Sequence, residues 1–500
     1  MKKILYTLLV LVLASSCTME PVRNARQEKA QPKIYPDYVG VTVPVNIAPL
    51  NFCMADEKAL LVDAVIADSN GNSIHSQGEE SLDFDITDWH RLLDSNRGDK
   101  LSVTVSAKYE DGWHTYRPFN IIVSTDSIDY GICYRLIEPG YEVWSKMGIY
   151  ERDLSSFSER ALIENTQFEG CVNCHSFNRG NSADMSIHVR GAHGATLLRN
   201  NGGDFTAFNT KTPETLGLCV YPYWHPSGRY IAYSTNATSQ IFHGSDSNRV
   251  EVFDTASDLQ VYDVEKNILL LSPLLRQDSI YETYPVFSAD GRSLYFCAAR
   301  AIPENSLKLD SLHYNLCRID FDPATGKFGS RIDTVVYAEG KNKSISFPRP
   351  SYDGRYLCYT LSDYGQFSIW HHEADLCLLN LSTGESRTMT EANSEDTESF
   401  HNWSTNSRWL VFSSRRDDGL YTRPYFCHVD ANGVVGKAFM LPQQNPRRFY
   451  RDRFFSFNVP DFTIAPVQFN AHKACGIINK EYRKKFGVKH DNFSEEEKRR

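Results

Sequence analysis

Two cysteines and a histidine form the group of residues best suited to chemistry. They stand in the run Cys171-Val172-Asn173-Cys174-His175, where two residues separate the thiols and the imidazole follows at once. In c-type haem attachment, two thiols at this spacing bond to the porphyrin and the adjacent histidine becomes the proximal iron ligand. The pattern therefore predicts one haem c, held by Cys171, Cys174 and His175.

Three other interpretations of the thiols stay open. Cys171 and Cys174 could form a local disulfide, act as a thioredoxin-like redox pair, or contribute to a zinc site. A thioredoxin motif requires a βαβ setting, whereas this motif is expected to follow a helix and to precede a polar loop. No second cysteine or histidine pair stands nearby at zinc-site spacing. Haem attachment is the interpretation that we prefer.

The distal ligand of such a haem has several candidates. Met185, His188 and His193 follow the motif closely. Met185 and His188 are three residues apart, so on a strand only one of them would face the iron. We favour His188, which stands between two β-branched apolar residues. Alternatively, His188 and Arg190 share a solvated strand face; if that face meets the haem, Arg190 is suited to pair with a propionate.

The first residues predict export. Two lysines precede an apolar run at 4–13, and small residues then lead to Cys17. This run is too short to span a bilayer and is typical of a secretory signal. The end of segment 1–17 resembles a bacterial lipobox, which implies lipidation of Cys17; the alternative is cleavage near Ala14. Residues 18–31 form a polar tether, so we expect a lipid-anchored protein of the cell envelope, on its periplasmic or outer-membrane side.

Composition narrows the class of protein. The chain has 500 residues, a net charge of −9 and no basic run before its tail, which argues against nucleic acid as a partner. Its 28 phenylalanines and 27 tyrosines favour strands. Nucleophile-elbow, H-E-x-x-H and phosphate-loop motifs are absent from the sequence. We therefore predict an all-β protein with no catalytic residue, more suited to electron transfer or binding than to catalysis.

The part of the chain before the motif is predicted to hold one domain and a linker. Residues 32–135 contain β-branched runs separated by turn residues, a pattern typical of a small immunoglobulin-like β-sandwich. Residues 136–184 are expected to form a linker that carries the haem motif and a short helix. Ser156 and Glu159 have the spacing of a capping box, so this helix would end near Thr166.

The chain repeats itself over residues 185–470. Four segments share a tight turn followed by an arginine and a strand whose alternate residues are apolar. A unit of short strands at a fixed period indicates the blades of a β-propeller. The turn positions are Gly228, Gly291, Gly354 and Ser407, and the arginines are Arg229, Arg292, Arg355 and Arg408.

These segments resemble the repeat of TolB-like propellers. The matching pieces are H-P-S-G-R at 225–229, S-A-D-G-R at 288–292 and S-Y-D-G-R at 351–355. The resemblance covers 185–470 and implies about six blades, of which four can be aligned. It also implies a platform for protein interaction. Residues 471–500 are expected to be a charged, solvated tail.

Three functions follow from these features. The first is electron transfer or redox sensing by one haem, with the propeller docking an unknown protein redox partner. The second is a non-redox interaction or scaffold module for another envelope protein, as the TolB-like repeat implies. The third is a peroxidase-like haem enzyme, in which His188 or His193 would serve as the acid–base group beside an open iron site.

Overall fold

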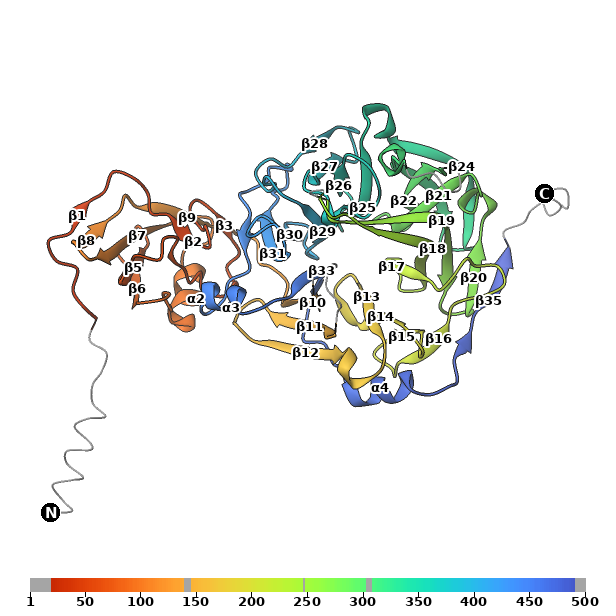
Figure 1. The fold of residues 1–500 in the computed structure, drawn as a ribbon, viewed down its shortest axis with the longest axis horizontal. Coiled ribbons are helices and arrows are strands. Elements are labelled where there is room, and N and C mark those ends of the chain that lie inside the picture. The colour runs from red at the N-terminus through yellow and green to blue at the C-terminus, as the bar shows by residue number, and fades with distance from the viewer. Residues whose placement is uncertain (1–18, 139–144, 246–247, 303–307, 491–500) are drawn as a thin grey trace, which may run out of the picture. The chain divides into compact units, whose positions relative to one another are not determined.

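The computed structural model describes residues 19–138, 145–245, 248–302 and 308–490 (Figure 1). Cys17 and the rest of the predicted signal segment lie outside the described residues. The chain divides into two compact units. The first unit comprises residues 1–40, 49–123 and 442–452, and the second comprises 41–48, 124–441 and 453–500.

The first unit is built on one sheet in which the strands follow the order β1-β8-β7-β5-β6. Strand β9 pairs with β7 as well, and β2 pairs with β4 in a separate ribbon. The elements are β1 (Arg26–Gln27), β2 (Ile34–Tyr35), β4 (Cys53–Met54), β5 (Leu61–Ala67), β6 (Ser73–Gly78), α2 (Ile86–Asp94), β7 (Lys100–Tyr109), β8 (Gly112–Thr115), β9 (Phe119–Val123) and α3 (Pro446–Arg451).

The predicted immunoglobulin-like sandwich is not confirmed in this unit. Strands β8 and β9 pair with the two halves of one edge of β7, and β5 pairs with the other edge, so these strands share one sheet instead of forming two. Asp85 caps the N-terminus of helix α2, and its side chain accepts hydrogen bonds from the Thr87 and Asp88 amides. The helix contacts β6 and buries Trp89, Leu92 and Leu93.

The second unit is a six-bladed β-propeller whose sheets are antiparallel except at the outer edges of blades 2 and 3, where a C-terminal strand pairs in parallel. Blade 1 contains β10 (Gly131–Ile137), β11 (Met147–Asp153), β12 (Glu159–Glu164) and β33 (Ser456–Thr463). Blade 2 contains β13 (Cys171–Asn178), β14 (Asn181–Arg190), β15 (Ala195–Arg199), β16 (Thr206–Asn209) and β34 (Lys484–Lys485). Blade 3 contains β17 (Val220–Trp224), β18 (Tyr230–Phe242), β19 (Val250–Asp263), β20 (Ile268–Leu271) and β35 (Gly487–His490).

Blades 4 to 6 are regular four-stranded sheets. Blade 4 contains β21 (Ile280–Phe287), β22 (Ser293–Arg300), β23 (Asn315–Asp322) and β24 (Lys327–Val336). Blade 5 contains β25 (Ser344–Pro350), β26 (Tyr356–Ser362), β27 (Asp375–Asn380) and β28 (Ser386–Thr388). Blade 6 contains β29 (Glu398–Trp403), β30 (Trp409–Ser414), β31 (Arg423–His428) and β32 (Phe439–Met440). The unit also contains β3 (Thr42–Val43) and α4 (Ala471–Ile478).

The ring is closed in blade 1, where the C-terminal strand β33 pairs with β10. The propeller therefore begins earlier than the repeats suggested. Residues 136–184, which we expected to form a linker, contribute β11, β12 and β13. The helix predicted from Ser156 is wrong: the Ser156 hydroxyl donates to Asp153 in the turn between β11 and β12, and β12 follows. Part of the predicted tail is ordered as α4, β34 and β35.

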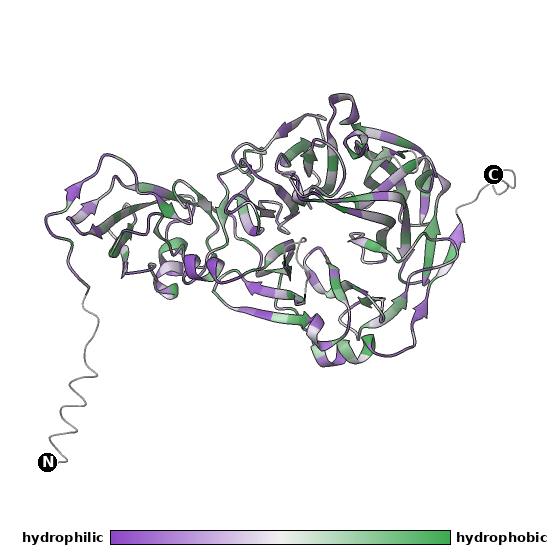
Figure 2. Cartoon of the chain, in the orientation of Figure 1, coloured by the Kyte–Doolittle hydropathy of each residue, from purple (hydrophilic) through white to green (hydrophobic). Residues whose placement is uncertain are grey.

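The repeated turn has the conformation that its residues favour. Gly228, Gly291 and Gly354 all have a φ of 73°, and Ser407 replaces glycine with a φ of 60°. The alternate apolar positions of the following strands are buried between blades, as in Leu294 of blade 4. Figure 2 shows the hydropathy of each residue along the ribbon of the chain. The strands after the turn are buried at almost every position, so both of their faces contact other parts of the propeller.

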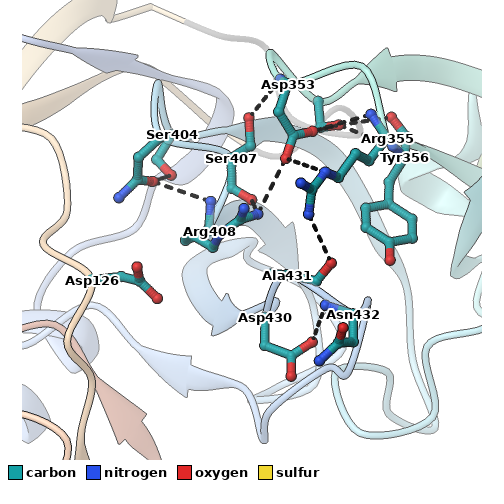
Figure 3. A network of polar contacts seen from close by, with 12 residues as sticks. Asp126, Asp353, Arg355, Tyr356, Ser404, Ser407, Arg408, Asp430, Ala431 and Asn432 are labelled. Atoms are coloured by element: carbon teal, nitrogen blue, oxygen red, sulfur yellow. Dashed lines mark hydrogen bonds and ion pairs between the residues drawn. The ribbon is translucent and has the colours of Figure 1, made fainter.

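Two arginines of the repeat, Arg355 and Arg408, join blades 5 and 6 (Figure 3). The Arg408 guanidinium donates to the Asp353 carboxylate of the preceding blade at 3.3 Å. The Asp353 amide donates to the Ser407 hydroxyl at 3.0 Å, a contact that glycine could not make. Arg355 donates to the Ala431 carbonyl in blade 6 at 3.2 Å. These contacts give the repeated turn its role in holding blades 5 and 6 together.

Candidate functional site

A cavity of about 850 Å³ lies at the centre of the propeller. All six blades contribute to its wall, and so does the hairpin of β18 and β19, whose strands are the longest in the ring and extend beyond their neighbours (Figure 1). We call this cavity the channel. One wall residue from each blade in turn is Arg135, Cys174, Tyr221, Phe287, Phe347 and Phe400.

Each innermost strand of the propeller contains a β-bulge at the same level. One non-glycine residue there has a φ near 50°, and the register with the next strand shifts at that point. Cys174 occupies this position in blade 2, so its backbone conformation is a property of the propeller repeat. The six bulge residues are Cys174, Tyr221, Tyr284, Phe347, Phe400 and Val459.

His175 follows the bulge of blade 2 just as His401 follows the bulge of blade 6. The His175 Nε2 atom lies 3.2 Å from the Cys133 carbonyl, and the His401 Nε2 atom lies 3.0 Å from the Cys358 carbonyl. In both cases the carbonyl belongs to the second strand of the preceding blade. Burial lowers the pKa of His175 to about 4 and that of His401 to about 3. Both imidazoles are therefore neutral side chains that join two blades.

The two thiols of the cysteine–histidine motif fit the attachment of a haem, whereas its histidine does not. Cys171 and Cys174 are half-buried free thiols on the channel wall, as covalent attachment requires. Burial raises the pKa of Cys171, although the nearby Arg135 and Arg190 oppose this. His175 does not fit an iron ligand in this arrangement, because its Nε2 contacts Cys133 and its Nδ1 is buried without a partner. Coordination would require the imidazole to leave the blade interface.

The three distal candidates lie away from the channel wall. Met185 is buried in an apolar cluster of blades 1 and 2. His188 is buried opposite Asn173 in the register of β13 and β14, and burial lowers its pKa to about 3. His193 is half-buried in the turn after β14. The structure thus brings none of the three together with the two thiols.

Arg190 does reach the channel, where the sequence had suggested an anion contact. It is joined there by arginines that the sequence did not single out, since each stands in a strand or turn without a motif. Five arginines and two carboxylates line the cavity. The arginines are Arg135, Arg179, Arg190, Arg349 and Arg415, and the carboxylates are Glu138 and Asp461.

The β18–β19 hairpin is held to blade 5 by a buried charged contact. Glu251 on β19 lies 3.1 Å from the His371 Nε2 atom and also accepts a hydrogen bond from the Tyr364 hydroxyl. Glu373 contacts the Nδ1 atom of the same imidazole at 3.1 Å. Burial alone would lower the pKa of His371, but the two glutamates outweigh it and raise this pKa to about 9. His371 is therefore charged at neutral pH.

A metal site or a membrane-spanning helix would give the described residues other functions. In this part of the chain, no group of three or more histidine, cysteine, aspartate or glutamate side chains is placed to hold a metal ion. The helices that the structure describes include none long and apolar enough to cross a membrane.

The chain is a six-bladed β-propeller protein, and comparisons with known proteins add little beyond this class. No protein-family model and no curated protein matches the chain. It is similar to the solved structure of a TolB-assigned protein from Agrobacterium tumefaciens, with 13% identity and a TM-score of 0.38, over 67% of this chain and 99% of that one.

Two peptidases are also similar. Prolyl oligopeptidase B from Galerina marginata matches with 11% identity and a TM-score of 0.34, over 67% of this chain and 42% of that one. Dipeptidyl peptidase 4 from Porphyromonas gingivalis matches with 11% identity and a TM-score of 0.31, over 65% of this chain and 52% of that one. The chain spans about half the length of these peptidases or less. All three TM-scores lie below 0.5, and the propeller is assigned from the strand order of the chain itself.

Proposed function

We propose that this protein is a non-redox binding module whose central channel is the binding site. The observation that supports this proposal is the cavity of about 850 Å³ to which all six blades and the β18–β19 hairpin contribute. Binding cavities for small molecules commonly have about 300–1,000 Å³. The wall combines apolar and aromatic side chains with a few charged groups, which is the composition of a selective site.

Photo-crosslinking in intact cells tests this proposal. A benzophenone amino acid is placed at Phe242 or Phe367, which line the channel, and at Tyr337 as an exposed control that does not. We expect adducts from the two channel positions and none from Tyr337. The mass of each adduct reports whether the partner is a protein or a small molecule. Equal yields at all three positions would contradict the proposal.

Covalent attachment of one haem is the second candidate, and it stays a prediction. The observation in its favour is that the Cys171 and Cys174 thiols line the same cavity. The contact of His175 with Cys133 does not favour it. Mature protein produced together with the cytochrome c maturation system separates the two candidates by its mass and by haem staining of a denaturing gel. Added porphyrin that is lost in Cys171→Ala would establish haem, whereas an unchanged mass leaves the binding module.

We also propose that the protein is exported and anchored in the cell envelope through an acylated Cys17. The support for this lies in the sequence of segment 1–17. Incorporation of labelled palmitate into the wild-type protein, and its loss in Cys17→Ala, is the expected result. Labelling that persists in Cys17→Ala would contradict the anchor and leave the channel proposal untouched.

A further inference from the structure

Two arginines on one side of the channel have no acidic partner. Arg135 on β10 and Arg190 at the end of β14 both line the cavity, and neither forms an ion pair with any described residue. The Arg135 Nε atom is buried without a hydrogen-bond acceptor in the described structure. A guanidinium keeps its charge and offers five donors in a planar fork. Buried donors of this kind are costly unless an acceptor meets them.

Arg135 and Arg190 lie near each other, beside the thiols of Cys171 and Cys174. Burial lowers the pKa of Arg135, the thiols of Cys171 and Cys174 oppose this, and the positive charge of Arg190 lowers it further. Cys171 lies opposite Arg190 in the register of β13 and β14. Two like charges at one wall of a cavity repel each other, and an anion placed between them would relieve this repulsion.

The two carboxyl groups of the channel are engaged elsewhere. Glu138 accepts hydrogen bonds from the amide and hydroxyl of Ser145. Asp461 accepts from the Phe177 amide at 3.2 Å and from the Asn402 side chain at 2.6 Å. Burial raises the pKa of Asp461 to about 7, so that this group carries only part of a negative charge at neutral pH. The channel therefore presents an excess of positive charge.

Aromatic rings occupy the bulges of four consecutive blades. Tyr221, Phe347 and Phe400 line the cavity, and the buried Tyr284 packs between Tyr221 and Phe347 without lining it. The ring centroids are 4.6 Å apart for Tyr221 and Tyr284, 4.1 Å for Tyr284 and Phe347, and 4.8 Å for Phe347 and Phe400. The two remaining bulge positions hold the smaller Val459 and Cys174, in the blades that carry Arg135 and Arg190. The aromatic bulge residues thus belong to the four blades that carry neither Arg135 nor Arg190, and Arg349 and Arg415 add positive charge to the wall in blades 5 and 6.

We propose that the channel binds an amphipathic organic acid, whose carboxylate contacts Arg135 and Arg190 and whose apolar part lies against the aromatic rings of the bulges. Paired guanidinium groups suit a carboxylate, because each can donate two parallel hydrogen bonds to it. Flat aromatic rings offer a large apolar surface at little cost in side-chain entropy. This inference rests on the proposed function of the channel as a binding site, and it specifies the class of ligand.

The test compares an acid with its uncharged ester. The probe is 11-(dansylamino)undecanoic acid, whose fluorescence reports binding, and its methyl ester has the same apolar part without the charge. The full-length mature protein is titrated with each. We expect the acid to bind about tenfold more tightly than the ester, because the charge-assisted hydrogen bonds are available only to the acid. Equal affinities, or no binding of the acid, would overturn the proposal.

Substitutions identify the side chains responsible. Arg135→Gln and Arg190→Gln should each weaken binding of the acid about tenfold and leave binding of the ester unchanged, and the double variant should show no preference. Arg179→Gln is the matched control, since Arg179 lines the same cavity but lies after β13 and stacks on the Tyr352 ring. Arg135→Lys retains the charge and should retain the preference for the acid.

The outcomes separate this inference from the proposal on which it rests. A preference for the acid that persists in the double variant would show that other groups recognise the carboxylate, which overturns the role of Arg135 and Arg190. Thermal unfolding of each variant shows whether it is folded, and the retained ester binding provides the same check at the site. Adducts at Phe242 and Phe367 without any preference for the acid would preserve the channel as a binding site for a ligand of different chemistry.

Discussion

Replacing Glu251 with glutamine removes one charge of the buried contact that joins the β18–β19 hairpin to blade 5. The glutamine keeps the shape of the side chain and its hydrogen bonding to Tyr364. It leaves the charged His371 with Glu373 as its single acidic partner among the described residues. His371 is only 1% exposed, so solvent cannot compensate for the lost charge. We therefore expect the hairpin and blade 5 to lose stability.

The size of this effect follows from the pKa of His371. The value rises from its ordinary 6.5 to about 9, and each pKa unit corresponds to about 1.4 kcal/mol. The charged contacts of His371 thus stabilise the folded state by about 3 kcal/mol, an amount comparable to the cost of breaking a buried ion pair. Because the folded pKa is the higher one, this stabilisation is complete below about pH 6.5 and is lost as the pH rises through about 9.

Urea unfolding at two pH values measures the prediction. At about pH 6, Glu251→Gln should lower the free energy of unfolding of the propeller by about 2–3 kcal/mol, and at about pH 9.5 by less than about 1 kcal/mol. Glu265→Gln is the control, since Glu265 is 66% exposed in its contact with Arg229 and should matter little at either pH. A penalty of the same size at both pH values would refute the electrostatic explanation and assign the effect to shape or to Tyr364.

The remaining predictions concern the blade interfaces. His175→Gln and His401→Gln should lower the free energy of unfolding by similar amounts, about 1–3 kcal/mol, in urea titrations at neutral pH. Because both pKa values are depressed, wild-type stability should also fall as the pH drops from about 6.5 towards 4. A much larger loss for His175 would contradict their equivalence. Gly291→Ala should be clearly more destabilising than Gly384→Ala in thermal unfolding, because φ is alike but the new Cβ would meet His225 at 2.0 Å only in the first case.

The propeller could be predicted because its repeated turn is encoded by local residue preferences. Glycine at 228, 291 and 354 adopts a positive φ that most residues avoid, and the strand after each turn places apolar residues at the same alternate positions. Two blades could not be recognised in this way. Blade 1 is closed by β10 and β33, which lie more than three hundred residues apart, and no local pattern specifies a pairing at that distance.

Blade 2 carries a weaker form of the repeat in its sequence. The run His175-Ser176-Phe177-Asn178 followed by Gly180 aligns with Pro285-Val286-Phe287-Ser288 followed by Gly291, with one residue fewer in the turn. The structure places both runs on innermost strands directly after a bulge.

The helix predicted at Ser156 is wrong because its local signal is ambiguous. A serine three residues before a glutamate suits a helix start, but it suits a turn between two strands equally well.

The cysteine–histidine motif illustrates why spacing alone does not determine chemistry. On a regular strand, residues three apart face opposite sides, yet the bulge at Cys174 brings both thiols to the channel wall. The same bulge directs His175 towards the preceding blade, where His401 shows that an imidazole can serve as an interblade contact without a thiol beside it. The motif therefore divides into two thiols available to the channel and one histidine engaged in the fold. Whatever occupies the channel meets those thiols together with Arg135 and Arg190, and the positive charge of that wall selects for an acid.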